Sequence, residues 1–169
     1  KKRYLLKFFI LILLCAAAYF LLHSSVFTVK KVELAENPHM TQEQMKEVTG
    51  YKKGINLFEI DARENEKKLE NDAYIKEADI SRKLPDTIKV TLTLREQNAV
   101  IQSDKGYVLI DDEGIVIDVL EQPAQVTLLS GLTVKTAEKG KPVEVKETKK
   151  YEQYMDLLVK IEKADMYFK

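Results

Sequence analysis

Residues 82–96 read RKLPDTIKVTLTLRE, and this stretch decides the fold of the residues around it. Its apolar side chains fall at every second position: Ile88, Val90, Leu92 and Leu94. Successive side chains of a strand point to opposite faces, so this alternation predicts a strand with one buried and one solvated face. Pro85 and Asp86 are turn residues, and they set where the strand begins.

Upstream of this stretch the pattern reads strand, helix, helix, strand. Val29, among lysines, belongs to the first predicted strand, and Ile80 belongs to the second. Thr41 and Asp61 are each followed three residues later by Gln or Glu, which is the capping-box pattern that opens a helix. Gly50 ends the first of these helices. With residues 82–96, the order becomes β-α-α-β-β.

Downstream of Gln97 the chain becomes a meander of short apolar runs. They cover residues 99–101, 107–110, 115–119 and 126–129. The joint Asp111-Asp112-Glu113-Gly114 suggests calcium by its charge, but its spacing is not that of an EF-hand loop. A solvated hairpin turn is therefore favoured.

From Lys146 to Lys163 apolar residues recur at helical spacing. They are Tyr151, Tyr154, Met155, Leu158 and Ile161. A stripe of this kind predicts an amphipathic helix whose apolar face packs on a core, and a groove for a partner is the less favoured alternative.

Composition excludes several classes of protein. The chain has 169 residues, 45% of them hydrophobic, with one Cys and two His. These counts exclude a disordered tract, a polytopic membrane protein and a disulfide scaffold, and they leave little for metal or triad chemistry. Four of the 27 cations lie in residues 1–22, so the rest carries 23 cations against 27 anions. Interspersed charges of this kind argue against nucleic-acid binding.

The N-terminal segment predicts a membrane anchor. Tyr4 to Leu22 would form a helix of about 28 Å, close to the apolar thickness of a bilayer, if Lys7 extends to the headgroups. We assign six residues to this span: Tyr4, Phe8, Leu14, Cys15, Tyr19 and Leu22. Residues 16–18 would also suit a cleavable signal peptide, but the apolar run continues past them. The cations before the span predict a cytoplasmic N-terminus and an extracytoplasmic remainder.

The order of elements, directly after one anchor, resembles a polypeptide-transport-associated (POTRA) domain, in particular that of the FtsQ/DivIB family of bacterial cell-division proteins. The motifs that carry the resemblance are 27–29, 54–61, 75–78, 82–88 and 94–96. Within them and at the first helix cap we single out Val29, Thr41, Gly54, Leu57, Phe58, Asp61, Arg82, Leu84, Pro85, Asp86, Arg95 and Glu96. Residues 107–111 with Gly114 resemble the opening of the family's second, β-rich domain.

The resemblance implies an α+β protein in three parts. Residues 1–25 are the basic flank and transmembrane helix, 26–96 the POTRA-like domain, and 97–169 an incomplete β-rich domain that ends in a helix. It implies a non-enzymatic scaffold without cofactor, metal or small-molecule substrate. Its partners would be other single-span division proteins of the FtsL and DivIC/FtsB type, and its location the plasma membrane at the division septum.

Most of these motif residues also have a purely structural interpretation. We expect Leu57, Phe58 and Ile60 to insert into the core, with Phe58 sharing the core of the alternating strand. Arg82, Arg95 and Glu96 could form a partner-contact patch, although charges at strand ends more often serve only solvation.

Two other function classes compete with a division scaffold. An anchored envelope hydrolase would need catalytic groups, and only His23 and His39 are available as imidazoles. A POTRA-bearing outer-membrane transporter would need a β-barrel and a cleaved signal. Because the sequence starts with Lys1, we expect it to be a fragment that lacks the N-terminus of the gene product, and the family resemblance implies further strands after Lys169.

Overall fold

The structure is a computed structural model that describes residues 2–34, 37–52 and 54–167. The chain falls into two compact units, each described here by itself. The first unit comprises residues 1–69 and 77–92, and the second comprises residues 70–76 and 93–169.

The chain begins with the long apolar helix α1, Lys2–Leu22. Its segment Arg3–Leu22 is long and apolar enough to cross a membrane, and none of that window is buried inside the protein. All six residues predicted for the span lie on this helix. The 3-10 turn η1, Ser25–Phe27, follows after two residues.

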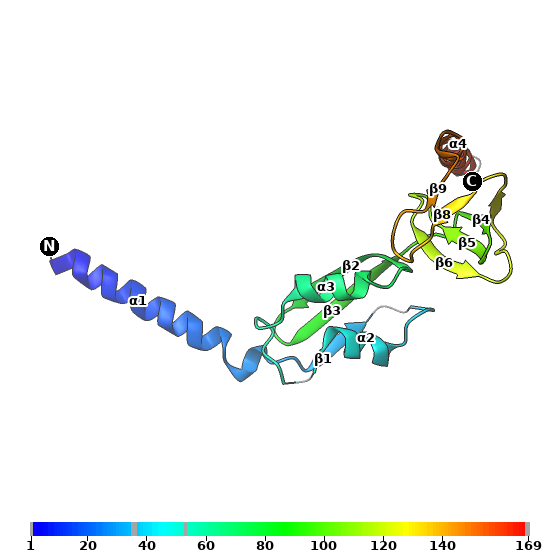
Figure 1. Ribbon diagram of the computed structural model, residues 1–169. Helices are drawn as coiled ribbons and strands as arrows, with labels where there is room; N and C mark the ends of the chain where they lie inside the picture. Colours follow the sequence, from blue (N-terminus) through cyan, green and yellow to red (C-terminus); the bar gives the residue numbers. More distant parts are fainter. Residues whose placement is uncertain (1, 35–36, 53, 168–169) are drawn as a thin grey trace. The chain divides into compact units, whose positions relative to one another are not determined.

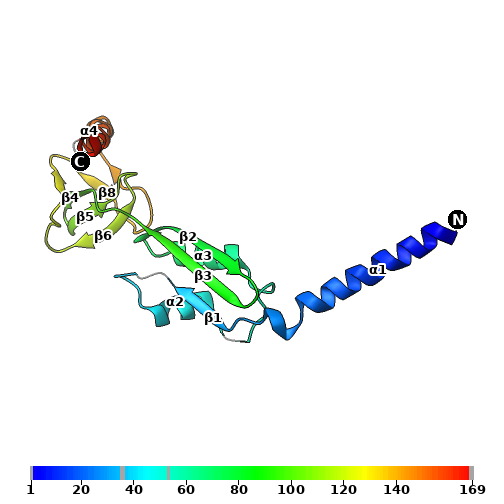
Figure 2. The same cartoon turned by 180° about the vertical axis from the view of Figure 1, so that it is seen from behind.

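The first unit is built on a three-stranded sheet in the order β1-β3-β2. The strands are β1 (Lys31–Leu34), β2 (Ile75–Lys83) and β3 (Thr87–Leu94), and β1 runs parallel to β3 with Lys31 opposite Thr87. Helices α2 (Gln42–Thr49) and α3 (Ala62–Glu70) cover one face of the sheet (Figure 1), and Figure 2 shows the sheet from the other side. Ile88 and Val90 are buried beneath the helices, so the predicted alternation of β3 is confirmed.

Local signals explain the bounds of α2 and α3. Thr41 Oγ1 accepts a hydrogen bond from Gln44 N, and Gln44 Oε1 accepts one from Thr41 N, which is the complete capping box. Gly50 ends α2 with φ 65°, a left-handed conformation that favours glycine. Asp61 Oδ1 accepts from Glu64 N at 3.0 Å at the start of α3.

The prediction that Phe58 lies in the core is wrong. Its side chain is 40% exposed, whereas that of Leu57 is fully buried. Asn56 bridges Thr28, and residues 57–59 then form a turn: Glu59 N donates to Asn56 O at 3.1 Å and Phe58 N donates to Asn56 Oδ1 at 2.9 Å. Leu57 takes the inward position, and Phe58 packs edge-on against Phe27 with 5.3 Å between ring centroids.

The second unit is a four-stranded sheet in the order β6-β5-β4-β7. Its strands are β4 (Ala99–Ser103), β5 (Gly106–Ile110), β6 (Val116–Leu120) and β7 (Thr127–Leu129). The first three form the predicted antiparallel meander, and β7 returns parallel to β4. The short pair β8 (Val134–Thr136) and β9 (Glu144–Val145) was not predicted.

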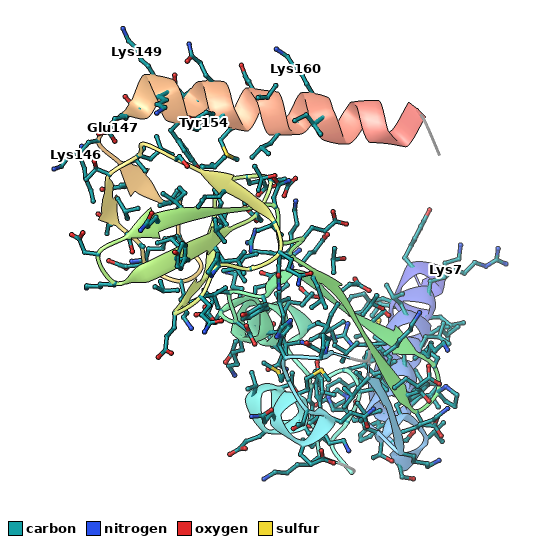
Figure 3. The ribbon with its side chains drawn as sticks, turned by 90° about the vertical axis from the view of Figure 1, so that its right-hand side faces the viewer. Lys7, Lys146, Glu147, Lys149, Tyr154 and Lys160 are labelled. Atoms are coloured by element: carbon teal, nitrogen blue, oxygen red, sulfur yellow. The ribbon has the colours of Figure 1, made fainter. Side chains whose placement is uncertain are left out.

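Helix α4, Thr148–Tyr167, packs on the core of this second sheet. Figure 3 shows Tyr154 directed toward the sheet and Lys149 and Lys160 directed away from it. The predicted apolar stripe contacts the core through four residues: Tyr151, Tyr154, Met155 and Leu158. Ile161 is 49% exposed instead, because a 20-residue helix of about 30 Å extends past the core cluster. The predicted α+β order is confirmed.

Candidate partner-contact site

Arg82, a candidate contact residue, is engaged inside the first unit. It lies near the end of β2, and its guanidinium donates from Nε to Leu57 O at 2.9 Å and from Nη2 to Ile60 O at 2.8 Å. These two carbonyls belong to the loop that leads into α3. Arg82 therefore fixes the conformation of that loop, while the residue as a whole stays exposed.

Arg95, the second candidate, forms an ion pair inside the second unit. Its Nη1 donates to Asp111 Oδ2 at 2.6 Å, and the exposed side-chain fractions are 14% for Arg95 and 0% for Asp111. The other carboxylate oxygen, Oδ1, accepts from Ile115 N at 2.7 Å and from Glu113 N at 3.0 Å. A buried carboxylate is stable only with such compensation.

The expectation of a solvated turn at 111–114 is therefore wrong for Asp111. Its carboxylate lies inside the turn and organises it, with Gly114 at φ 79° completing the bend. The Asp-x-x-Gly spacing was a signal for the turn. Nothing local in the sequence indicated Arg95 as the partner, because the two residues are 16 positions apart.

Two further polar clusters of the second unit were missed from sequence. Lys76 Nζ lies 2.9 Å from Glu113 and 3.5 Å from Asp112, and the hydrogen bond to Glu113 raises the pKa of Lys76. Tyr74 donates from its hydroxyl to Asp118 Oδ2 at 3.0 Å. Burial, together with this bond, raises the pKa of Tyr74 to about 12.

The remaining candidate, Glu96, follows β3 and is exposed. The three predicted contact residues thus have different surroundings: Arg82 and Arg95 hold internal loops of different units, and Glu96 presents its side chain to solvent. A role of these residues in partner contact stays a prediction.

The two histidines lie in different parts of the described chain. His23 contacts the Tyr19 carbonyl at the end of α1, and His39 lies exposed in a loop. Among the described residues no cluster of three or more His, Cys, Asp or Glu is arranged to hold a metal ion. Cys15 is an isolated thiol on α1.

Comparison with known proteins assigns this arrangement of elements to a family. The model of the POTRA domain, FtsQ-type, matches residues 27–95, the segment that holds β1 to β3 with α2 and α3. The cell division protein DivIB of Clostridium acetobutylicum is 26% identical over 75% of this chain and 52% of its own length. The cell division proteins FtsQ of Rickettsia bellii and of Corynebacterium glutamicum are 33% and 31% identical, over 54% and 63% of this chain.

Residues 27–95 therefore form an FtsQ-type POTRA domain, and the chain is similar to cell division proteins of the FtsQ/DivIB family. It spans about half of the length of these relatives or less: 52% of the DivIB protein, and 34% and 48% of the two FtsQ proteins. Within the FtsQ-type POTRA domain, the motif residues have visible structural tasks. Val29 and Leu57 are buried, Thr41 and Asp61 cap helices, and Gly54 takes a φ of 96°.

The turn Leu84-Pro85-Asp86 of this POTRA domain joins β2 to β3. Asp86 O accepts hydrogen bonds from Lys30 N at 2.9 Å and Lys31 N at 3.3 Å, which ties the turn to the start of β1. Leu84 is 63% exposed. The turn motif thus sets the register of the sheet, as its residue types predict.

The sheet edges of the two units differ in how they are protected. On β2, Glu66 Oε1 accepts from Ile80 N at 3.0 Å and so occupies a backbone donor. On β1, Glu33 is bonded by Lys31 and Lys83, and these bonds lower the pKa of Glu33 to about 2. Strand β7 has no charged residue, and its Leu128 is 48% exposed. Charged edges resist strand addition, so β7 is the least protected of these three.

Proposed function

We propose that the chain is the anchored part of a non-enzymatic division protein that binds other single-span division proteins through its extracytoplasmic units at the septum. One observation carries the proposal: an FtsQ-type POTRA domain starts five residues after an apolar helix of membrane-spanning length, and a separate β-rich unit follows it. A chain built in this way acts through the molecules that it contacts.

The membrane topology follows from charge. Four cations precede the apolar stretch, and His23 and two serines follow it, so the N-terminus is cytoplasmic and the residues after α1 lie outside the plasma membrane. A reporter that is active only in the cytoplasm, fused after Lys169, should be silent. Activity of that fusion would reverse the orientation.

The proposed partners are bitopic proteins of the FtsL and DivIC/FtsB type, as the family implies. The least protected sheet edge supports a contact by strand addition, because β7 offers backbone groups without charged side chains. Such a strand could come from a partner or from residues of the same protein that follow Lys169.

The decisive experiment compares two purified proteins: the chain of residues 1–169 and the full-length gene product. Each is mixed with the partner pair in detergent, and the complex is measured by co-purification. If the second domain binds through strands after Lys169, residues 1–169 should bind much more weakly. Equal binding would move the contact onto the described units, and no binding by either protein would remove the proposed function.

A charge reversal tests the candidate contact residue that is exposed. Glu96→Lys should weaken partner binding if this position contacts the partner, whereas Glu121→Lys provides the same charge change at another exposed position of the second unit. Equal effects of the two variants would remove Glu96 from the contact.

The alternatives predict different consequences of depletion. Cells that lack a division scaffold should elongate without septa while cell-wall hydrolysis in extracts continues. Loss of a hydrolytic turnover from those extracts would favour the anchored hydrolase. A defect in outer-membrane protein assembly would favour a POTRA protein of the transport class.

A further inference from the structure

Exposed apolar side chains of the first unit gather at one end. Outside α1, its described residues expose four large apolar side chains: Val26, Val48, Phe58 and Leu84. Three of the four lie in residues 26–30, 55–60 and 82–86, which we call the anchor-side loops. Val48 lies on α2. Such clustering marks an interaction surface, whereas scattered apolar residues would not.

Hydrogen bonds hold the anchor-side loops together as one surface. Residues 26–30 are joined to residues 55–60 by two bonds of 2.8 Å, in which Val29 N donates to Ile55 O and Leu57 N donates to Phe27 O. Residues 82–86 are joined to both segments: Lys30 N donates to Asp86 O at 2.9 Å, and Arg82 Nη2 donates to Ile60 O at 2.8 Å. Figures 1 and 2 show η1 and the turn between β2 and β3 at the same end of the first unit. The apolar side chains are thus carried by a fixed scaffold.

The link between these loops and α1 is short. Three residues lie between Leu22 and Val26, so even a fully extended link of four Cα–Cα steps spans at most about 14 Å. Asn56 Nδ2 donates to Leu22 O at 2.8 Å, which brings the second loop to the end of α1. Phe58 is two residues farther on, within about 7 Å. The headgroup layer of one leaflet is roughly 5–8 Å thick, so a spanning α1 places these side chains at its level.

The charges around the loops are balanced. Lys30 lies 3.4 Å from Asp86, and Lys83 lies 2.9 Å from Glu33. A hollow of about 470 Å³ beside Phe58 is lined by two carboxylates and two guanidiniums: Glu59, Asp61, Arg63 and Arg82. Contact with a charged lipid surface through these groups would gain little net attraction. The apolar side chains are the part of this surface that a membrane would stabilise.

We propose that the anchor-side loops rest on the outer surface of the membrane, with Val26, Phe58 and Leu84 inserted among the lipid headgroups. The contact would restrict the tilt of the POTRA domain above the bilayer. This inference rests on the proposed membrane-spanning role of α1, and it assigns the lipid surface as the occupant of the exposed apolar cluster.

The chain has no Trp, so one introduced Trp reports on a single position. Phe58→Trp and Leu84→Trp are each reconstituted, as the whole chain, into vesicles of phosphatidylcholine and phosphatidylglycerol with brominated acyl chains. Thr91→Trp is the matched control. It is an exposed position of the same unit, four residues along β3 from Thr87, about 13 Å away at 3.3 Å per residue.

We expect brominated lipid to reduce the emission of both loop reporters about twofold relative to unbrominated vesicles, with little change for Thr91→Trp, because only the loops reach the acyl boundary. The reduction should persist at high salt, since the contact is apolar. Before each measurement, far-ultraviolet circular dichroism checks that the variant is folded, and flotation checks that it is bound to the vesicles. The use of two loop positions guards against a folding defect at one of them.

The outcomes separate this inference from the proposed function. Failure of all three variants to float would remove the anchor and the inference together. Flotation with unquenched loop reporters would leave the anchor intact and overturn the inference, and a blue shift without quenching would show that protein, and not lipid, covers the loop surface. Equal quenching at Thr91→Trp, or quenching that high salt abolishes, would also overturn it.

Discussion

The two units use the same residue type, arginine, to fix a loop, but they give it different acceptors. In the first unit Arg82 donates to the neutral carbonyls of Leu57 and Ile60, and the residue stays exposed. In the second unit Arg95 donates to the fully buried carboxylate of Asp111. A neutral acceptor that loses its donor can accept from water, whereas a buried carboxylate that loses its counter-charge is destabilised in the folded state. The second unit should therefore depend far more on its arginine pair.

The largest effect is expected when this pair is broken. Asp111→Ala leaves the Arg95 guanidinium with only the more distant and more exposed Glu113 carboxylate, at 3.9 Å, and removes the acceptor of two turn amides, so it should cost about 3–5 kcal/mol of the free energy of unfolding of the second unit. Hydrogen exchange resolved by residue should show the loss in the second unit, with the first unit unchanged.

Asp112→Ala is the control for this prediction. Its carboxylate is partly exposed and pairs with Lys76, and such a pair contributes about 1 kcal/mol or less. A similar loss for the two variants would mean that burial of Asp111 is not the cause.

In the first unit, the stability of the loop that contains Leu57 and Phe58 should depend mainly on the burial of apolar side chains. Leu57→Ala removes a fully buried side chain and should cost about 2–5 kcal/mol. Phe58→Ala should cost about 1 kcal/mol in detergent, because the ring is 40% exposed and packs chiefly on Phe27. Denaturant unfolding of both variants measures which one loses more of its free energy of unfolding. A greater loss for Phe58→Ala would mean that the Phe58 ring is part of the core.

Removal of the first unit's arginine should have a smaller effect. Arg82→Met keeps the aliphatic stem but loses two charge-assisted hydrogen bonds, and we expect a loss of about 1–3 kcal/mol. Hydrogen exchange of the amides in residues 57–61 measures it. If Arg82→Met lost as much free energy of unfolding as Asp111→Ala, the second unit would not depend more strongly than the first on its arginine.

The sequence predicted those parts of the fold that local signals determine. The alternation of β3 and the capping box at Thr41 act over a few residues and can be interpreted without tertiary contacts. Leu57 and Phe58 could not be told apart, because both are apolar and their orientation depends on the turn that follows the bridge between Asn56 and Thr28. Strands β8 and β9, of three and two residues, are too short to show a period.

For the candidate site, residue type alone was a poor guide, because the role of each arginine depends on the acceptors with which it pairs. Arg82 and Arg95 look alike in sequence, as cations near the ends of neighbouring strands. Their acceptors lie 22 to 25 and 16 positions away, and those distant partners turn both arginines into internal contacts. Glu96 remains exposed, and its role depends on a partner that the sequence cannot specify.

The smallest effect concerns one tyrosine in each unit, the buried Tyr51 and the half-buried Tyr74. Burial raises the pKa of both Tyr51 in the first unit and Tyr74 in the second to about 12. For Tyr74 the hydrogen bond to Asp118 adds to the shift, whereas for Tyr51 the nearby Asn65 amide partly opposes it. Because the folded-state pKa lies above the unfolded value of 10, this stabilisation is complete below pH 10 and is lost as the pH rises toward 12.

Tyr74→Phe should therefore lower the free energy of unfolding at pH 7 by about 1 kcal/mol, the net value of one hydrogen bond, and reduce the loss of stability between pH 10 and 12. Tyr51→Phe should reduce the same alkaline loss with a smaller change at pH 7, because it removes no bond to a carboxylate. Denaturant unfolding at pH 7 and pH 11, with exchange data assigning each change to its unit, measures both. If Tyr51→Phe costs as much as Tyr74→Phe at pH 7, burial alone determines both tyrosines, and charge then distinguishes the two units only at the pair of Arg95 with Asp111.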